Sequence, residues 1–344
     1  MNKVEVKIDH NYHPQNIHKL EAWESGKSDD YKEYRKNWVN WPKNNIVGRV
    51  PIHLDIEATS NCNLLCTMCA RTTMVENGNF WKVQEFDYIK YKEIIDEAAH
   101  KGVQSLKFNY LGEPLMNRNI FKMVSYAKEK GIIDTMFNTN ATSLTKEKSK
   151  KIIECGLDKL FFSFDSPYKD EYEKIRVNAN YLKTLKNIIQ FHEIRGNNPK
   201  ESYTPFTRVS MVKINENDKK FSDFKKLFEP IVDVVAAVDY MDHSMMNNNS
   251  EGKNRVENII STDKSNSSSK FCCPQLWQRM FIHPDGVVTP CCVDVNRTMV
   301  MGNIYNNNIE EIWTSKKYNK LRETHRNGNI DSISTCRNCP LANH

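Results

Sequence analysis

The sequence lacks a hydrophobic run that could cross a membrane, since no apolar stretch approaches the roughly 18 residues that a bilayer requires. It also lacks a block of charge of one sign. The 49 Lys and Arg and 43 Asp and Glu residues are spread along the chain and give a net charge of only +6. These absences argue against membrane insertion and against nucleic-acid binding. The 344 residues suffice for one α/β domain of about 200 to 250 residues and a smaller one.

The beginning of the chain shows neither the basic segment nor the apolar segment of a secretory signal. We therefore expect a cytoplasmic protein with reduced thiols, and a disulfide framework is disfavoured. Cys155 ends a predicted helix and is expected to be a buried structural thiol. The other cysteines form two groups, one at Cys62, Cys66 and Cys69, and one at Cys272, Cys273, Cys291, Cys292, Cys336 and Cys339.

The first group has the spacing C-x3-C-x2-C, which can hold three corners of a cubane [4Fe–4S] cluster. A fully ligated cluster takes four Cys thiolates, and neither flank of this run offers a fourth, so one iron would stay open to a ligand from solution. Zinc is the alternative, but zinc prefers paired C-x2-C knuckles or mixed Cys/His sets, and no downstream His is near. The run follows a predicted strand at residues 52–57 and a loop at 58–61.

Residues 51–240 alternate short β-branched or aromatic runs with longer helical ones, the pattern of a parallel sheet covered by helices. We expect strands at residues 52–57, 105–110, 134–138, 159–164, 206–211 and 232–239, and helices at 87–101, 119–130, 145–154, 181–195 and 218–228. Six β/α units predict an open or partial barrel. Ligands of such folds gather where the strands end.

Residues suited to a polar ligand follow three of these strands. Gly112 would let the backbone approach a ligand closely, and Glu113 can accept hydrogen bonds from an ammonium group. Asn140 lies in a stretch whose amides and hydroxyls suit a ribose or, equally, the N-cap of the next helix. Ser163 begins the stretch Ser-Phe-Asp-Ser after the fourth strand.

These features together resemble the radical S-adenosylmethionine (radical SAM) enzymes, which have a TIM-like (β/α)6 partial barrel. The resemblance implies that the open iron binds the amino and carboxylate groups of the cofactor's methionine. The turn at Gly112 and Glu113 is similar to the family's "GGE" motif, with Leu111 in place of the first Gly, so Glu113 would hold the amino group.

The same resemblance assigns three further cofactor contacts. Residues 163–176 are similar to the family's "S-x-D … Y-x-x-I-R" stretch. Ser163 would then face the ribose or the carboxylate, and Arg176 would bind the carboxylate. Met68 stands where the family often has an aromatic residue on the adenosine, a contact that methionine can also make.

The second cysteine group surrounds a predicted β-hairpin at residues 281–289, whose turn is Pro-Asp-Gly. Because successive side chains of an extended backbone point to opposite faces, only one member of each adjacent pair can face a common metal. Four ligands remain: one of Cys272 and Cys273, one of Cys291 and Cys292, then Cys336 and Cys339.

The order Cys273, Gly286, Cys291 resembles the opening of the SPASM and shorter twitch domains, small iron–sulfur domains of a β-hairpin plus a helix that follow radical SAM barrels. This implies an auxiliary [4Fe–4S] cluster on Cys273, Cys291, Cys336 and Cys339, as in single-auxiliary-cluster members such as 2-deoxy-scyllo-inosamine dehydrogenase. A structural four-Cys zinc is the alternative.

We therefore expect four regions. An N-terminal extension covers residues 1–50, in which Trp23, Trp38 and Trp41 would pack onto the barrel. A radical SAM barrel (51–240), a polar linker (241–270) and an auxiliary-cluster domain (271–344) follow.

The resemblance implies an oxidoreductase that takes an electron from a reductant such as flavodoxin or ferredoxin, cleaves S-adenosylmethionine to a 5′-deoxyadenosyl radical and removes a hydrogen atom from its substrate. Our first hypothesis is oxidation of a sugar or aminocyclitol alcohol. The second is modification of a peptide or protein side chain. A non-catalytic metal-binding interaction protein is disfavoured, because it would not need a cofactor pocket. The sequence identifies no catalytic acid or base.

Overall fold

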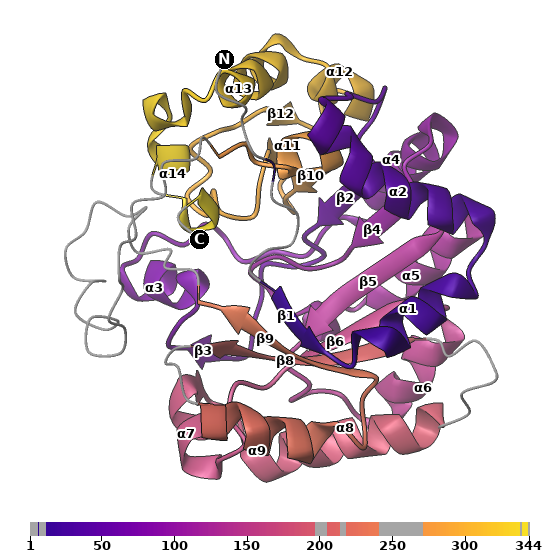
Figure 1. Ribbon diagram of the computed structural model, residues 1–344, viewed down its shortest axis with the longest axis vertical. Coiled ribbons are helices and arrows are strands. Elements are labelled where there is room, and N and C mark those ends of the chain that lie inside the picture. The colour runs from indigo at the N-terminus through magenta and orange to yellow at the C-terminus, as the bar shows by residue number, and fades with distance from the viewer. Residues whose placement is uncertain are drawn as a thin grey trace.

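The computed structural model describes residue 6 and residues 12–196, 205–213, 218–240, 271–337 and 339–342, so the predicted linker at 241–270 lies outside the described residues. Figure 1 shows a central sheet with helices along it and a small C-terminal region above it. The helices are α1 Ile17–Ser25, α2 Asp29–Asn44, α3 Ala70–Glu76, α4 Tyr88–Lys101, α5 Ile120–Glu129, α6 Lys146–Glu154, α7 Lys169–Ile175, α8 Tyr181–Arg195, α9 Asp218–Phe228, α11 Gln275–Gln278, α12 Ile309–Trp313, α13 Lys316–Arg326 and α14 Ser334–Arg337.

Ten strands form the main sheet in the order β1-β9-β8-β6-β5-β4-β2-β10-β11-β12. They are β1 Tyr12–Gln15, β2 His53–Ile56, β4 Ser105–Lys107, β5 Asp134–Thr139, β6 Lys159–Ser163, β8 Phe206–Lys213, β9 Val234–Asp239, β10 Arg279–Ile282, β11 Val287–Thr289 and β12 Gly302–Asn303. The six strands from β2 to β9 are parallel, as predicted. The observed bounds differ from the predicted ones by at most three residues, and the α/β partial-barrel class is confirmed.

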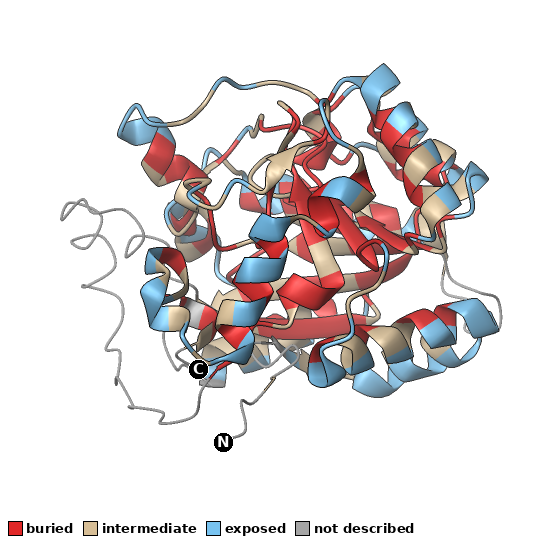
Figure 2. Cartoon of the chain, turned by 90° about the horizontal axis from the view of Figure 1, so that it is seen from above, coloured by how far each residue is buried: buried red, intermediate tan, exposed pale blue. Residues whose placement is uncertain are grey.

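The two faces of the parallel sheet differ in polarity. Leu54, Leu106, Phe137, Leu160 and Val209 point to the helices and have no exposed surface. Figure 2 shows this buried layer between the strands and the amphipathic helices, whose outer sides are exposed. The alternate residues point to the opposite side, which we call the inner face. Most of the hydrophobic core therefore lies between sheet and helices, and the inner face can carry polar groups.

The N-terminal segment runs across the starting ends of the strands (Figure 1). Trp38 of α2 contacts His53, the first residue of β2, with ring centroids 5.7 Å apart. Tyr34 donates hydrogen bonds to Ser105 and Asp134, the first residues of β4 and β5, at 3.2 and 3.1 Å. Similar contacts join Tyr31 to Lys159 of β6 and Trp23 to Phe206 of β8. These helices thus cover the end of the barrel opposite the strand ends where ligands are expected.

The C-terminal region joins the same sheet. β10 pairs in parallel with β2, the first barrel strand, and β11 returns antiparallel to β10, which confirms the predicted hairpin. Gly286 occupies the hairpin turn with φ +80°, and a Cβ there would lie 2.5 Å from the Asn303 side chain. At the other edge β1 pairs antiparallel with β9. The auxiliary-cluster region is therefore hydrogen-bonded directly to the barrel.

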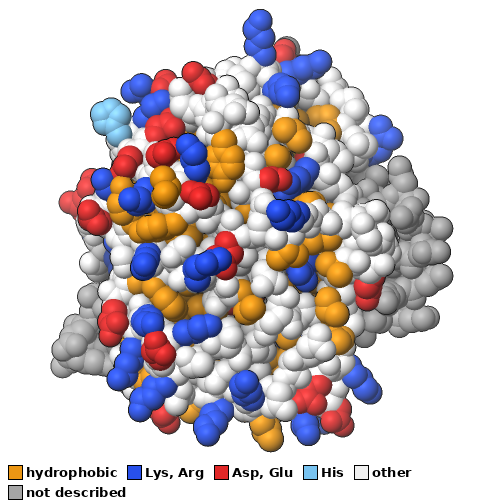
Figure 3. All heavy atoms as spheres, turned by 180° about the vertical axis from the view of Figure 1, so that it is seen from behind, with side chains coloured by type: hydrophobic (Ala, Val, Ile, Leu, Met, Phe, Trp, Pro, Cys, Tyr) orange, Lys and Arg blue, Asp and Glu red, His pale blue; other side chains and the backbone are white. Residues whose placement is uncertain are grey.

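The surface carries mixed charge. On the face shown in Figure 3, blue Lys and Arg side chains alternate with red Asp and Glu side chains. This mixture fits a solvated surface better than a nucleic-acid interface. Among the described residues, no helix combines the length and the apolar character needed to cross a membrane.

Candidate cluster and cofactor sites

Cys62, Cys66 and Cys69 lie in one loop beyond the end of β2. Cys66 belongs to β3 (Leu65–Cys66), which pairs antiparallel with β7 (Arg176–Val177), so that Cys66 faces Arg176 directly. The backbone N–H of Cys69 donates to the Cys66 carbonyl at 3.1 Å, and α3 begins at the next residue. The loop is thus held by backbone contacts on both sides of its central cysteine.

The Gly112 turn packs directly on this loop. A Cβ at Gly112 would lie 1.8 Å from the Thr59 carbonyl oxygen, so no side chain fits at this position. The N–H of Glu113 donates to the Asn61 carbonyl at 2.8 Å, immediately before Cys62. Glycine is therefore required here because the turn packs closely on the backbone of Thr59, a neighbour that the sequence did not indicate.

Glu113 is 4% exposed and is held by three neutral donors. Its carboxylate accepts hydrogen bonds from the Thr139 hydroxyl and the Asn140 N–H, both at 2.7 Å, and from the Leu115 N–H at 3.2 Å. Burial raises the pKa of Glu113, although these hydrogen bonds oppose the shift. A buried carboxylate with neutral donors favours a cationic ligand such as an ammonium group.

Asn140 links Glu113 to the cysteine loop. Its side-chain Nδ2 lies 4.0 Å from the Cys62 sulfur and donates to Asn63 at 3.0 Å. Its Oδ1 accepts hydrogen bonds from the backbone N–H and the hydroxyl of Thr142. Asn140 is therefore not the N-cap of α6, a role that Thr145 fills.

Arg176 is buried beside the cluster loop. One of its amino groups pairs with Asp165 at 2.6 Å, and the other lies 3.9 Å from the Cys66 sulfur. Ser163, at the end of β6, and Met68, between Cys66 and Cys69, are both half-buried. The structure thus brings Arg176 to the cysteine loop, and Asp165 is a partner of Arg176 to which the sequence assigned no role.

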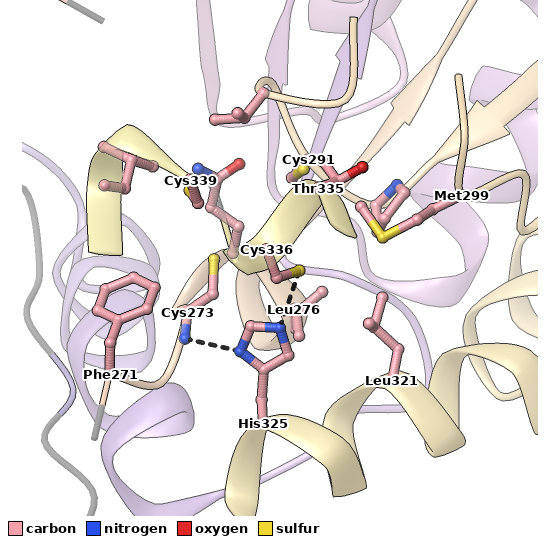
Figure 4. A pocket seen from close by; sticks show the side chains of 14 residues that line it. Phe271, Cys273, Leu276, Cys291, Met299, Leu321, His325, Thr335, Cys336 and Cys339 are labelled. Atoms are coloured by element: carbon pink, nitrogen blue, oxygen red, sulfur yellow. Dashed lines mark hydrogen bonds between the residues drawn. The ribbon is translucent and has the colours of Figure 1, made fainter. Parts of the chain in front are cut away.

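Four thiols of the C-terminal group line one apolar pocket (Figure 4). They are Cys273, Cys291, Cys336 and Cys339, whereas the described lining includes neither Cys272 nor Cys292. The remaining wall is mostly apolar, with Phe271, Leu276, Val293, Met299, Leu321 and Leu341 among its residues. Four thiols in an apolar setting are the donor set of a fully ligated [4Fe–4S] cluster.

The thiols at both sites are buried or half-buried. Burial raises the pKa of Cys66 and of Cys336 to about 12 each, and that of Cys339 to about 11. These thiols are therefore protonated at neutral pH before metal binds, and metal binding must release their protons. Among the described residues, no three His, Cys, Asp or Glu side chains are grouped as ligands of a single metal ion.

His325 of α13 is a polar neighbour of the C-terminal pocket that the sequence did not indicate, because a lone His on a helix carries no motif. Its Nδ1 accepts the backbone N–H of Cys273 at 3.3 Å, and its Nε2 lies 3.4 Å from the Cys336 sulfur (Figure 4). Burial lowers the pKa of His325 to about 4. The imidazole is therefore neutral, and its Nε2–H donates to the sulfur.

We expect His325→Leu to make the reduction potential of the C-terminal cluster more negative, because hydrogen bonds to cluster sulfurs raise it. One hydrogen bond of about 1 kcal/mol corresponds to roughly 40 mV for a one-electron couple. The measurement is a redox titration followed by electron paramagnetic resonance in a background lacking Cys62, Cys66 and Cys69. His325→Gln keeps a donor and should shift the potential less. Equal potentials in all three proteins would show that His325 does not act on the cluster.

Two family models match the chain. The Radical SAM superfamily model matches residues 56–228, half of the chain, and the SPASM model, described as an iron-sulfur cluster-binding domain, matches residues 272–340. The first range contains the Cys62 loop, and the second contains all four thiols of the C-terminal pocket.

Two curated relatives match along most of the chain. The S-adenosyl-L-methionine-dependent 2-deoxy-scyllo-inosamine dehydrogenase of Niallia circulans is 22% identical over 83% of this chain and 91% of its own. The tungsten-containing aldehyde ferredoxin oxidoreductase cofactor-modifying protein of Pyrococcus furiosus is 23% identical over 83% of this chain and 86% of its own.

Solved structures share the fold. BtrN in complex with AdoMet and 2-DOIA superposes with a TM-score of 0.55 at 18% identity, covering 86% of this chain and 94% of BtrN. Streptococcus suis SuiB bound to precursor peptide SuiA superposes with a TM-score of 0.59 at 14% identity, covering 85% of this chain and 71% of SuiB. At these identities the likeness concerns the fold.

Proposed function

The chain belongs to the radical SAM superfamily, and from this membership we propose that it oxidises a polar small molecule, a sugar or aminocyclitol alcohol, with its C-terminal cluster accepting an electron. Its cofactors are S-adenosylmethionine and [4Fe–4S] clusters. When bound, they supply a 5′-deoxyadenosyl radical that removes a hydrogen atom from the substrate. The observation that carries the proposal is the four-thiol pocket attached to the barrel sheet through β10 and β2.

We assign Cys62, Cys66 and Cys69 to the open cluster, and Cys273, Cys291, Cys336 and Cys339 to the auxiliary one. Glu113 would hold the methionine ammonium, since its carboxylate is buried among neutral donors. Arg176 would hold the methionine carboxylate, and Asp165 orients its guanidinium. Gly112 lets its turn pack against the Thr59 backbone before the cysteine loop. Asn140, Ser163 and Met68 would complete the cofactor site. The N-terminal helices exclude water from the far end of the barrel.

Oxidation of an alcohol to a ketone removes two electrons and two protons from the substrate. The hydrogen atom taken by the radical accounts for one electron and one proton. The second proton leaves to water, and the second electron leaves to an acceptor that a cluster held by the C-terminal thiol pocket would supply. The similarity to the Niallia circulans dehydrogenase supports this assignment.

Modification of a peptide side chain is the second candidate, supported by the fold shared with peptide-bound SuiB. The two candidate functions differ in the size of the substrate. A short precursor-peptide gene beside this gene would favour the peptide, and sugar-biosynthetic genes would favour the small molecule.

Glu113→Gln is expected to weaken S-adenosylmethionine binding by about 1.5 to 3 kcal/mol, since it removes the charge from a charge-assisted hydrogen bond but keeps the shape of the side chain. This corresponds to about a tenfold to hundredfold higher Kd. Isothermal titration of the reconstituted protein measures it, with iron content as the folding control and exposed Glu147→Gln as the matched variant. Wild-type affinity in Glu113→Gln would make Glu113 a turn residue only.

The proposed function is tested by incubating anaerobically reconstituted protein with S-adenosylmethionine, dithionite and a panel of sugars and aminocyclitols. We expect 5′-deoxyadenosine in every case, and one equivalent of ketone per 5′-deoxyadenosine with a true substrate. Deuterium at the oxidised carbon should appear in 5′-deoxyadenosine. Absence of 5′-deoxyadenosine would contradict the enzyme class, and product formed without oxidation would contradict the dehydrogenase.

A further inference from the structure

One face of α13 packs against the four-thiol pocket. Its buried residues are Tyr318, Leu321, Arg322 and His325, which recur at the three- and four-residue spacing of one helix face. Leu321 and His325 line the pocket, as Figure 4 shows. Arg322 lies directly after Leu321 and one turn before His325. A charged side chain is therefore buried next to the residues that form the pocket wall.

Neutral groups hold the Arg322 side chain, which is 1% exposed. Its Nε donates to the carbonyl of Leu276, a residue of the pocket wall, at 2.9 Å. One amino group donates to the Trp313 carbonyl at 3.0 Å and to the Asn319 side chain at 2.9 Å. The guanidinium carbon lies 4.1 Å from the centre of the Trp313 ring and 4.8 Å from that of the Tyr318 ring. The guanidinium group is thus fixed in place without an ion pair.

No carboxylate among the described residues compensates the charge of Arg322. Burial lowers the pKa of Arg322 to about 10, while Tyr318 raises it and the charge of Arg326 lowers it, and no described carboxylate acts on it. The second amino group is buried and has no hydrogen-bond partner in the described part of the chain. Arg322 is still positively charged at neutral pH, and a buried charge without a counter-charge is costly.

Asp294 is a buried carboxylate near the thiols, but it is not the partner of Arg322. Its oxygens accept hydrogen bonds from the N–H and the hydroxyl of Thr298 and from the N–H of Met299, all at 2.8 Å. Burial raises the pKa of the Cys336 thiol, and the charge of Asp294 adds to this shift. Asp294 therefore opposes negative charge on the thiols and leaves the Arg322 charge unmatched.

Negative charge would arise next to Arg322 when the pocket is loaded. The metal-free thiols are protonated at neutral pH, whereas thiolates bound to iron carry negative charge, and each electron taken up adds to it. The pocket wall is mostly apolar and Arg322 is buried, so solvent ions screen the interaction little. A fixed cation at this place stabilises the reduced form of a cluster more than its oxidised form.

Building on the proposed function, in which the C-terminal cluster accepts an electron from the substrate, we infer that Arg322 supplies the positive charge that raises the reduction potential of this cluster and so lets it take up that electron. Arg322 acts through the cluster and does not touch the substrate. The alternative is a purely structural arginine that joins α13 to α11 and to the end of α12. That role needs the hydrogen bonds but not the charge, so the two roles predict different behaviour of variants.

The test is a redox titration, followed by electron paramagnetic resonance, of the anaerobically reconstituted chain lacking Cys62, Cys66 and Cys69, which reports the C-terminal cluster alone. Arg322→Met should lower the potential, so that the ratio of reduced to oxidised cluster at a fixed potential falls at least tenfold, or about 59 mV for a one-electron couple. Arg322→Lys loses the guanidinium hydrogen bonds but keeps a positive charge, and should stay closer to the wild-type potential than to that of Arg322→Met.

Arg326→Met is the matched control, because Arg326 is an exposed arginine of the same helix whose charge solvent screens. It should leave the potential unchanged. A wild-type potential in Arg322→Met would overturn the inference. Equal shifts in Arg322→Met and Arg322→Lys would also overturn it, because the hydrogen bonds and not the charge would then matter.

Iron content and the thermal unfolding midpoint are recorded for each variant, because Arg322→Met also removes the hydrogen bonds to Leu276, Trp313 and Asn319. If Arg322→Met holds no iron, Arg322→Gln takes its place as a neutral side chain that can still donate a hydrogen bond. Iron lost from both neutral variants but kept in Arg322→Lys would support the need for charge. Iron lost from all three variants would make the guanidinium group structural and overturn the inference.

The proposed function and this inference fail differently. A C-terminal site that gives no one-electron signal with Arg322 in place would remove the electron acceptor, and with it the proposed function. A site that titrates, but whose potential Arg322→Met leaves unchanged, would retain the proposed function and lose only the role of Arg322.

Discussion

Cys66→Ala is expected to form no 5′-deoxyadenosine above the protein-free background. Cys66 is the central thiol of the C-x3-C-x2-C loop, and its backbone ties β3 to β7. Two thiols cannot hold a cubane cluster with one open iron, so the site for the cofactor's methionine would be lost. The assay is quantification of 5′-deoxyadenosine by chromatography after anaerobic reconstitution and reduction by dithionite.

Cys155→Ala is the matched control for this experiment. Cys155 is a buried cysteine, 6% exposed, and its thiol donates to the Ile152 carbonyl at the end of α6, as expected for a structural residue. This variant should lose some stability but keep cleavage. Cleavage at the wild-type rate in Cys66→Ala would remove the assignment of the open cluster to this loop.

Replacing Cys336 and Cys339 together by serine is expected to uncouple cleavage from product formation. The open-cluster loop and the Glu113 turn lie elsewhere in the chain, so 5′-deoxyadenosine should still form. Ketone should fall to background, because the second electron of the oxidation would have no acceptor in the C-terminal pocket. The ratio of ketone to 5′-deoxyadenosine, measured by mass spectrometry, should be about one in the wild type, since one hydrogen atom is taken per oxidation.

Cys272→Ser provides the comparison for the double variant. Cys272 is buried beside Cys273 but is absent from the described lining of the four-thiol pocket. It should retain a ratio near that of the wild type. Ketone at the wild-type rate in the Cys336 and Cys339 double variant would make the C-terminal site structural, and the dehydrogenase proposal would lose its main support.

Much of the barrel could be predicted from the sequence because its signals are local. The strands at Asp134–Thr139 and Lys159–Ser163 are short runs bounded by helical patterns, and both appear in the structure within one residue of the predicted ends. The Gly112–Glu113 turn was identified by its position after a strand. A glycine and a carboxylate directly after a barrel strand indicate a ligand-binding turn more specifically than the same two residues do without that position.

What the sequence did not predict depends on contacts between distant residues. Tyr34 bonds to Asp134, 100 positions away, and no local pattern shows that α2 covers the strand starts. The two-residue strands β3 and β7 are too short for a periodicity, although they place Arg176 at Cys66. In the sequence, Lys107 is one charged residue within a predicted strand, and only the pairing of β2 with β4 places it beside Asp55.

Iron and zinc analysis of the reconstituted protein shows whether the chain holds two [4Fe–4S] clusters, one open and one closed. We expect about eight irons and no zinc per wild-type chain, and about four irons in a variant lacking Cys62, Cys66 and Cys69, by the four-iron content of each cluster. In that variant Cys273→Ser should lose the remaining iron and Cys272→Ser should keep it. About four irons and one zinc in the wild type would instead show that the C-terminal thiols hold a structural metal and no second cluster.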